Sequence, residues 1–452
     1  MRIMIVGAGM IGQHLSEKLS GEGQEVVLVD SDEKKLRRLE RELNVMPVVG
    51  SGASPRVLEK AGIEQTDLFI AVTDSDEINL IACIISRQYK VKTRIARVRN
   101  EDFYAQGTSR VEKTLGIDLV ISPDLAMTEE ILRLITLSQA VEVAEFGHGQ
   151  VDLLGYQAKA GHPCVGSTLA ELRDLQRTYH FLVVAITRGE TTIIPRGDDK
   201  VEVDDKLYLV ARRPDVPLVE KLLFATTSRL PRRVFIIGGG SIGAQVASQL
   251  EQLRIEVRLL EQDAKVCERL AEQLENTVVL NSDGLEAHDL LEEDIDQADL
   301  VIAVTSSDTT NILSSLLAKH HGAKKCITLI SNPGFVPMLG KLGIDVPLSP
   351  RQVAANMILR YVRRDGGGRV VSVASLLGND AEVVEMKVPD HDQFVDLPLK
   401  HLTFPYGSIV GAIMRGHQTI IPTGDTRLAP DDNLIIFFTS DAEQGVASLF
   451  DK

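Results

Sequence analysis

Three pairs of closely similar segments divide this chain into two halves. Residues 2–12 and 233–243 are identical at six of eleven positions, at an offset of 231 residues. Residues 67–79 and 299–311 share nine of thirteen at an offset of 232, and residues 183–198 and 410–425 share eleven of sixteen at an offset of 227. Because the offset stays nearly constant from the first pair to the last, the 452 residues consist of two long repeats of one arrangement.

Each half opens with a glycine-rich segment, "MIVGAGMIGQHL" at 4–15 and "FIIGGGSIGAQV" at 235–246. In a strand–turn–helix context the first glycine permits a tight turn, the second lets a pyrophosphate approach the backbone, and the third lets the helix pack on the strand. The helix expected from Met10 would direct its amino terminus at the phosphates. A coincidental glycine turn is the alternative. The predicted phosphate-binding residues are Gly7, Ala8, Gly9, Met10, Ile11 and Gly12 in the first copy and Gly238, Gly239, Gly240, Ser241, Ile242 and Gly243 in the second.

An acidic residue follows the last glycine of each copy by eighteen positions, Asp30 in the first and Glu261 in the second. A carboxylate at the end of the second strand accepts hydrogen bonds from ribose hydroxyls and repels a 2′-phosphate. NAD(H) or ATP therefore fits, and NADP(H) does not. The alternative is that each acid only caps the helix that follows.

The next candidate residues lie where two later strands end. "VTDSD" (72–76) and "VTSSD" (304–308) close the fourth strand of each half, at the sheet edge where ligands of open α/β sheets collect. Asp76 and Asp308 are expected to cap helices. The predicted crevice residues are Thr73, Asp74, Thr305 and Ser306.

Arg97 and Arg99 end the expected fifth strand and are candidate phosphate ligands, with ordinary surface arginines as the alternative. The aligned residues of the second half are Leu329 and Ser331, so the two sites are not expected to behave alike.

The pattern of elements predicts the fold class. In residues 1–121, short apolar strands (3–6, 25–29, 68–72 and 94–98) alternate with helical patterns, which indicates a doubly wound parallel sheet of the Rossmann type. Amphipathic linking helices, each with a broad apolar stripe, are expected at 122–140 and 349–364. Residues 141–226 and their repeat at 369–452 contain β-rich runs and one helical pattern at 169–176, typical of a small α+β domain. The second nucleotide-binding fold is expected at 232–348. Boundaries are expected at the polar or glycine-rich segments 147–150, just inside the first α+β domain, 226–233 and 365–368.

Composition excludes several classes of protein. A net charge of −15 argues against a nucleic-acid partner, which would need clustered Lys and Arg. The four cysteines are widely separated, which indicates neither a zinc site nor a disulfide framework and fits a reducing cytoplasm. No apolar run approaches the roughly 18 residues of a membrane span, so direct insertion is not expected.

The usual marks of an enzyme are missing from the sequence. It contains no nucleophile elbow, no P-loop lysine and no metal-ligand cluster. The six histidines of the α+β domains do not align between the halves, so they are read as surface or turn residues and not as acid–base catalysts.

The domain order, with the segments "VGAGMIG", "VTDSDEIN", "RGETTIIP" and "GGGSIG", closely resembles the RCK (KTN) family of regulatory subunits of bacterial Trk potassium uptake systems, over essentially the whole chain. The resemblance implies a non-enzymatic subunit that binds NAD(H), and also ATP or ADP, and forms a tetrameric ring. It implies a peripheral location on the cytoplasmic face of the inner membrane, beneath a membrane-embedded potassium transporter. It also adds Ser51 and Gly52 to the first site, near the adenine. An NAD-dependent oxidoreductase and a nucleotide sensor for another channel remain alternatives.

Overall fold

The computed structural model describes residues 1–103, 108–136, 140–176, 180–189, 191–225, 230–365, 370–375, 381–389, 394–416, 418–447 and 449. The chain forms two compact units, and each is described by itself. The first comprises Met1–Glu129 and Ser349–Gly366, and the second comprises Glu130–Leu348 and Gly367–Lys452.

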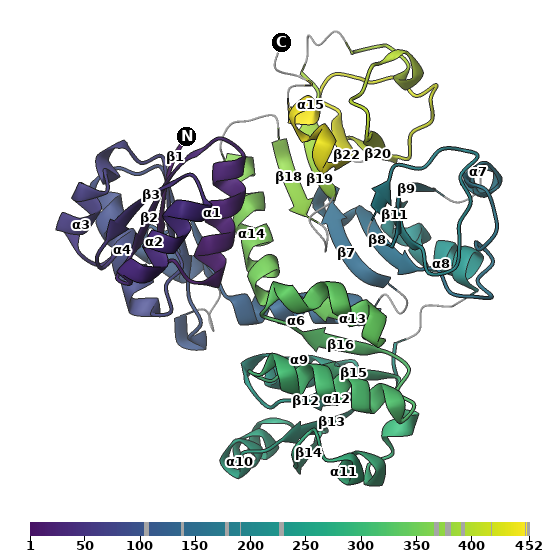
Figure 1. Cartoon of the computed structure of the whole chain (residues 1–452), viewed down its shortest axis with the longest axis horizontal. Helices are drawn as coiled ribbons and strands as arrows, with labels where there is room; N and C mark the ends of the chain where they lie inside the picture. Colours follow the sequence, from purple (N-terminus) through teal and green to yellow (C-terminus); the bar gives the residue numbers. More distant parts are fainter. Residues whose placement is uncertain are drawn as a thin grey trace. The chain divides into compact units, whose positions relative to one another are not determined.

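The first nucleotide fold is a six-stranded parallel sheet with helices between successive strands, which confirms the predicted doubly wound class (Figure 1). In their order across the sheet, its strands are β3 (Val45–Val49), β2 (Glu25–Asp30), β1 (Arg2–Val6), β4 (Leu68–Ala71), β5 (Thr93–Arg97) and β6 (Leu119–Ile121). The helical elements are α1 (Met10–Gly21), α2 (Glu33–Glu42), α3 (Pro55–Lys60), η1 (Ile63–Gln65), α4 (Asp76–Gln88), η2 (Glu101–Phe103) and α5 (Thr108–Leu115). The strand order reverses between β1 and β4, and such a switch point creates a ligand crevice at the carboxyl ends of the strands.

The central strands are buried on both faces, because helices cover the sheet on each side. Strand β1 runs Arg2–Val6 with four of its five residues buried, so it reads as a continuous apolar run without alternation. On α2, Leu36 and Leu39 are buried while the charged residues face water, as their helical spacing predicts. Leu43, four residues after Leu39, is only half-buried and ends the helix.

A helix from late in the chain completes the first unit. Helix α14 (Pro350–Asp365) packs along α1, as Figure 1 shows for the green and dark purple helices. Its buried side chains Ala355, Ile358, Leu359 and Val362 belong to the same apolar cluster as Leu15 on α1. The apolar face predicted for residues 349–364 is therefore buried against the first nucleotide fold, although it follows the second in sequence.

The second nucleotide fold repeats the strand order of the first. In order across the sheet, its strands are β14 (Val278–Asn281), β13 (Glu256–Glu261), β12 (Arg233–Ile237), β15 (Leu300–Ala303), β16 (Cys326–Leu329) and β17 (Val346–Leu348). The helical elements are α9 (Ser241–Gln252), α10 (Ala264–Gln273), α11 (Ala287–Glu292), η5 (Ile295–Gln297), α12 (Asp308–His320), η6 (Pro333–Phe335) and α13 (Val336–Leu342).

Each α+β domain contains a five-stranded antiparallel sheet. The first has, in order, β10 (Thr191–Ile193), β9 (Phe181–Arg188), β11 (Lys206–Arg212), β8 (Val151–Gln157) and β7 (Ala140–Phe146), with η3 (Gly147–Gly149), α7 (Leu169–Gln176), η4 (Arg213–Asp215) and α8 (Val216–Phe224). The second has β18 (Val370–Ser375), β19 (Ala381–Lys387), β22 (Asn433–Thr439), β20 (Ser408–Arg415) and β21 (Gln418–Ile420), with η7 (Leu399–His401), η8 (Ser440–Ala442) and α15 (Glu443–Ala447). One apolar cluster joins the two sheets, and in it the rings of Tyr208 and Phe437 lie 5.9 Å apart.

The structure refines three sequence expectations for these regions. The segment 147–150 lies inside the first α+β domain, as expected, and Gly147–Gly149 forms the turn that joins β7 to β8. The first α+β domain contains a second helix, α8, beside the expected one at Leu169–Gln176. The linking helix expected at 122–140 is α6 (Pro123–Thr136), and β7 begins at Ala140. Of the other two predicted boundary segments, residues 226–229 and 366–368 lie outside the described residues.

Among the helices that the structure describes, none has both the length and the apolar character that crossing a bilayer requires.

Candidate functional site

The three glycines of the loop between β1 and α1 differ in their backbone conformation and in the space around them. Gly7 adopts φ = +109°, and a Cβ there would lie 2.8 Å from the backbone nitrogen of Thr73. A Cβ on Gly12 would lie 1.8 Å from the carbonyl oxygen of Gly7, so the helix could not pack on the strand. A Cβ on Gly9, in contrast, would meet no described atom within 4 Å. Gly9 is thus the glycine that leaves the backbone accessible to a ligand.

The second loop reproduces this geometry, with one substitution: it has Gly239 where the first loop has Ala8. Gly238 has φ = +110°, and a Cβ on Gly243 would lie 2.0 Å from the Gly238 carbonyl oxygen. A Cβ on Gly240 would meet nothing within 4 Å. At Gly239, where the first copy has Ala8, a Cβ would lie 2.7 Å from a methyl of Leu270. The first turns of α1 and α9 contain the remaining predicted loop residues, Met10, Ile11, Ser241 and Ile242.

Both predicted acidic residues lie at the ends of their strands and face the glycine loops. Asp30 accepts hydrogen bonds from the backbone N–H of Ala8 at 2.6 Å and from that of Asp32 at 2.8 Å. Glu261 accepts from Gly239 at 2.7 Å and from Asp263 at 2.9 Å. The carboxylates are half-buried and aligned by backbone donors at the point where a ribose would lie.

The alternative that these acids are helix caps is wrong. The cap of α2 is Asp32, whose carboxylate accepts from Lys34 and Lys35. The cap of α10 is Asp263, which accepts from Lys265. Asp30 and Glu261 are therefore available for another role.

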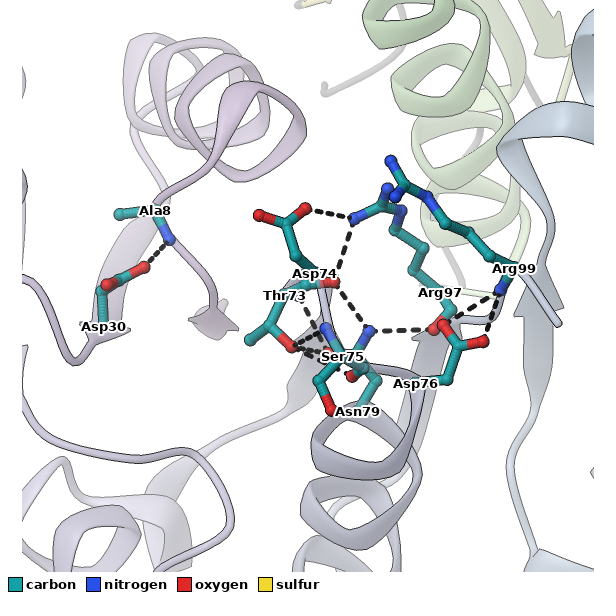
Figure 2. A network of polar contacts seen from close by, with 9 residues as sticks. All are labelled: Ala8, Asp30, Thr73, Asp74, Ser75, Asp76, Asn79, Arg97 and Arg99. Carbon is teal, nitrogen blue, oxygen red and sulfur yellow. Dashed lines mark hydrogen bonds and ion pairs between the residues drawn. The ribbon is translucent and has the colours of Figure 1, made fainter. Parts of the chain in front are cut away.

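Figure 2 shows the polar network at the carboxyl end of β4. Asn79 is fully buried on α4, and its Oδ1 accepts from the N–H and hydroxyl of Thr73 at 2.9 and 2.7 Å. Its Nδ2 donates to the carbonyl oxygens of Thr73 at 3.0 Å and Arg97 at 2.9 Å. One amide thus joins the ends of β4 and β5 and fixes the position of Thr73.

Asn311 makes the same four bonds in the second copy, to Thr305 and to the carbonyl of Leu329. Neither asparagine was predicted as a site residue, although both stand at the end of the repeated segment, at 79 and 311. One feature of the sequence could have identified them: both repeats have asparagine at the same position of a helix, and that position is buried in the fold.

The first site contains a buried cation. Arg97 is 6% exposed, and its Nη1 donates to the carbonyl oxygen of Thr73 at 2.9 Å and to Asp74 Oδ1 at 3.1 Å. The alternative that Arg97 is an ordinary surface arginine is therefore wrong. The second site has Leu329, 7% exposed, at this position and Ser306 at the position of Asp74. The two crevices consequently differ in charge.

Asp76 and Asp308 were expected to cap helices, and this expectation was wrong. The caps of α4 and α12 are Ser75 and Ser307, whose hydroxyls accept from backbone N–H groups. The Asp76 carboxylate instead accepts from the backbone N–H groups of Arg99 and Asn100 at 2.8–3.0 Å, which fixes the segment after β5. Asp308 does the same for Ser331 and Asn332.

The residues assigned near the adenine lie after β3, beside Asp30. The N–H of Gly50 donates to the carbonyl oxygen of Asp30 at 2.8 Å, which brings this turn to the acidic residue. A Cβ on Gly52 would lie 2.1 Å from a methyl of Val6, so Gly52 has a packing role whether or not it contacts a base. Ser51 is exposed, and its hydroxyl accepts from the N–H of Ala53 at 3.2 Å.

A buried thiol lies behind the second acid. Cys267 Sγ donates to the carbonyl oxygen of Glu261 at 3.2 Å. Burial, with the nearby negative charge of Glu261, raises the pKa of this thiol. A protonated, buried thiol is a poor nucleophile, so Cys267 serves packing.

Together these elements form a cradle suited to an adenine nucleotide. Each loop offers open space over a backbone glycine, a helix amino terminus behind it and a carboxylate at one end. Within the described part of the chain, no three His, Cys, Asp or Glu side chains are grouped to hold a metal ion. The geometry defines the class of protein: a Rossmann-type fold with a glycine-rich loop that is present twice, each copy followed by a small α+β domain.

Comparison with known proteins identifies the family. The TrkA-N domain model matches residues 3–123 and 234–350, and the TrkA-C domain model matches residues 153–223 and 383–451. The chain is 37% identical to the Trk system potassium uptake protein TrkA of Halomonas elongata, over 97% of this chain and 95% of that protein. It is 34% identical to TrkA of Vibrio alginolyticus, over 97% and 96%. The chain therefore belongs to the TrkA family, as its sequence motifs indicate.

Solved structures show the same fold. The GsuK RCK domain aligns over 100% of this chain and 95% of that chain with a TM-score of 0.62 at 20% identity. The GsuK channel bound to NAD aligns over 100% and 78%, also with a TM-score of 0.62 at 20% identity. At this level of identity the likeness concerns the fold.

Proposed function

We propose that this chain is the regulatory subunit of a Trk-type potassium uptake transporter and that it controls potassium flux by binding NAD(H), with ATP or ADP as a second class of ligand. The single observation that carries the proposal is the duplicated cradle, in which a backbone glycine loop faces a carboxylate aligned by main-chain N–H groups. Membership of the TrkA family supports the transport role. The NAD-bound GsuK channel, which has this fold, supports the choice of ligand.

The proposed binding residues follow from this geometry. The two glycine loops hold the pyrophosphate, and Asp30 and Glu261 accept hydrogen bonds from the ribose hydroxyls. Thr73, Asp74, Thr305 and Ser306 line the crevice at the switch point, and Arg97 supplies positive charge for phosphate at the first site. Ser51 and Gly52 border the adenine end of the first site.

The mechanism is conformational and not catalytic. A ligand that binds one conformation of the assembled protein more tightly shifts the population toward it, and a switch from 1:99 to 99:1 requires about 5.5 kcal/mol of differential binding. A homotetrameric ring on the cytoplasmic face of the inner membrane, beneath the transporter subunit, would divide that free energy among eight sites. The linking helices α6 and α14 are the proposed transmitters, since α14 already packs against the nucleotide fold beside the glycine-loop helix α1.

Two measurements test the proposal. The full chain should co-purify with a Trk-type membrane subunit, and NADH and ADP should bind it in calorimetry. Asp30→Ala should remove one class of sites, Glu261→Ala the other, and the double variant both. Glu64→Gln, an equal loss of charge at an exposed position away from the crevice, is the matched control and should bind as the parent does. Undiminished binding by the double variant would contradict the assignment.

One other function has support. The likeness to the GsuK channel favours a nucleotide sensor for a different channel, which would bind nucleotide but fail to co-purify with the Trk-type subunit. A soluble NAD-dependent oxidoreductase, the remaining alternative, would change nicotinamide absorbance when a substrate is added.

A further inference from the structure

The first site pairs a buried cation with an exposed anion. The Arg97 side chain is 7% exposed, whereas the side chain of its carboxylate partner Asp74 is 90% exposed. The pair is held by a single bond of 3.1 Å between Nη1 and Oδ1, longer than the roughly 2.7–2.9 Å typical of a charge-assisted hydrogen bond. An ion pair with an exposed partner contributes little to stability. Asp74 is thus an exposed counterion that binds a buried arginine only weakly.

Arg97 also keeps hydrogen-bonding capacity that Asp74 does not use. Its Nε is buried and has no hydrogen-bond partner among the described residues. A buried donor without an acceptor is costly, and a guanidinium offers paired N–H groups that match two oxygens of a phosphate. A phosphate offers this guanidinium more oxygens than the single one that Asp74 supplies.

The ion pair of Arg97 and Asp74 lies at the end of the crevice where the phosphates of a nucleotide would lie. Asp74 directly follows Thr73, whose backbone nitrogen lies against the glycine loop, 2.8 Å from the position of a Cβ on Gly7. Figure 2 shows the Asp74 carboxylate and the Arg97 guanidinium facing each other, with Asp74 on the side of Ala8 and the glycine loop. A carboxylate that stayed there would repel a pyrophosphate lying along the loop.

We infer that Asp74 is an internal competitor for Arg97: its carboxylate occupies the place of a phosphate oxygen, and a nucleotide must displace it to bind the first site. The inference rests on the proposed function and deepens it, because it makes Asp74 a specificity-determining residue whose removal strengthens binding of phosphorylated ligands. The second site, with Ser306 and Leu329 at the two positions, has no such competitor.

The test compares ligands with and without phosphate on the full chain. Glu261→Ala is present throughout, so that the first site dominates the signal, and ADP, NADH and adenosine are titrated by calorimetry. Asp74→Asn, which keeps the size of the side chain, should tighten ADP and NADH binding about two- to fivefold, the range of an exposed ion pair, and leave adenosine unchanged. Glu77→Gln removes the same charge from a neighbouring exposed position on α4 and is the matched control.

A double-mutant cycle separates displacement from simple repulsion. Arg97→Leu, which introduces the residue of the second copy, should weaken ADP binding and remove the gain from Asp74→Asn. Equal or weaker ADP binding by Asp74→Asn would overturn the inference, as would a gain that persists with Leu at 97 or that Glu77→Gln reproduces. A parent chain that binds neither ADP nor NADH would overturn the proposed function itself, and this inference with it.

Discussion

The carbonyl oxygen of Gly7 lies only 1.8 Å from the point where a Cβ on Gly12 would be placed. Contact this close between a strand end and a helix is possible only when the helix residue is glycine. The equivalent separation is 2.0 Å between Gly238 and Gly243.

Gly12→Ala should therefore destabilise the first nucleotide fold, because its methyl group meets backbone that cannot move away cheaply. We expect a loss of about 3 kcal/mol or more in the free energy of unfolding, at the upper end of overpacking effects. Urea denaturation measures it. Gly21→Ala, at the end of the same helix with nothing within 4 Å of the added Cβ, is the control and should show little change.

Gly9→Ala should separate binding from stability. Its backbone, at φ −74° and ψ −172°, suits any residue, and the added Cβ has open space, so the fold should lose no more than about 1 kcal/mol. The methyl group would occupy the approach to the pyrophosphate, so nucleotide affinity at the first site should fall at least about tenfold. Unchanged affinity in calorimetry would show that no phosphate lies over this glycine.

Asn79→Asp tests the buried network at the end of β4. The carboxylate cannot donate to the carbonyl oxygens of Thr73 and Arg97, and it buries a charge. We expect a loss of about 2–5 kcal/mol in stability with weaker binding at the first site. Asn311→Asp should produce the same loss at the second site only. Affinity that partly recovers at low pH, where the acid is protonated and donates once, would confirm a positioning role.

The positions of the glycine loops, of the acids at 30 and 261 and of the crevice threonines were predictable, because each follows a strand at a short, fixed spacing. Gly7, Asp30 and Thr73 each lie within a residue or two of a strand end, and a parallel sheet brings such ends together. The four strands expected in residues 1–98 also agree with β1, β2, β4 and β5 to within one residue at each end.

In the first α+β domain, strand β8 and helix α8 were not predicted, because burial hides the periodic pattern of their apolar residues. Strand β8 is buried on both faces, so its residues do not alternate as an exposed strand would. Helix α8 buries Glu220, which accepts a hydrogen bond from the Tyr156 hydroxyl at 3.0 Å. A buried acid interrupts the apolar stripe that identifies a helix. Burial and this carboxylate together raise the pKa of Tyr156 well above its usual value.

Lys325 should make stability depend on pH. Its Nζ donates to the Ala140 carbonyl oxygen at 2.9 Å, and burial lowers its pKa from 10.5 to about 8 despite the opposing influence of Asp345 and Glu220. Between these values the unfolded chain holds a proton that the folded chain has released, so the free energy of unfolding rises with pH.

Comparison with Lys325→Met isolates this effect. From about pH 7.5 to about pH 10.5 the parent should gain about 1–3 kcal/mol of stability relative to the variant, measured by urea denaturation. Lys324→Met, which changes an exposed neighbouring lysine, should show no such trend. A difference between parent and Lys325→Met that does not vary with pH would contradict the assignment.

The packing of α14 on α1 has a consequence for biosynthesis. The ribosome completes β1 to β6 long before it reaches Ala355, Ile358 and Leu359, which cover part of the apolar surface around Leu15. During translation of the intervening two hundred or so residues, that surface must be shielded by something other than its final neighbour. A nascent chain halted before α14 is therefore a natural client for a chaperone.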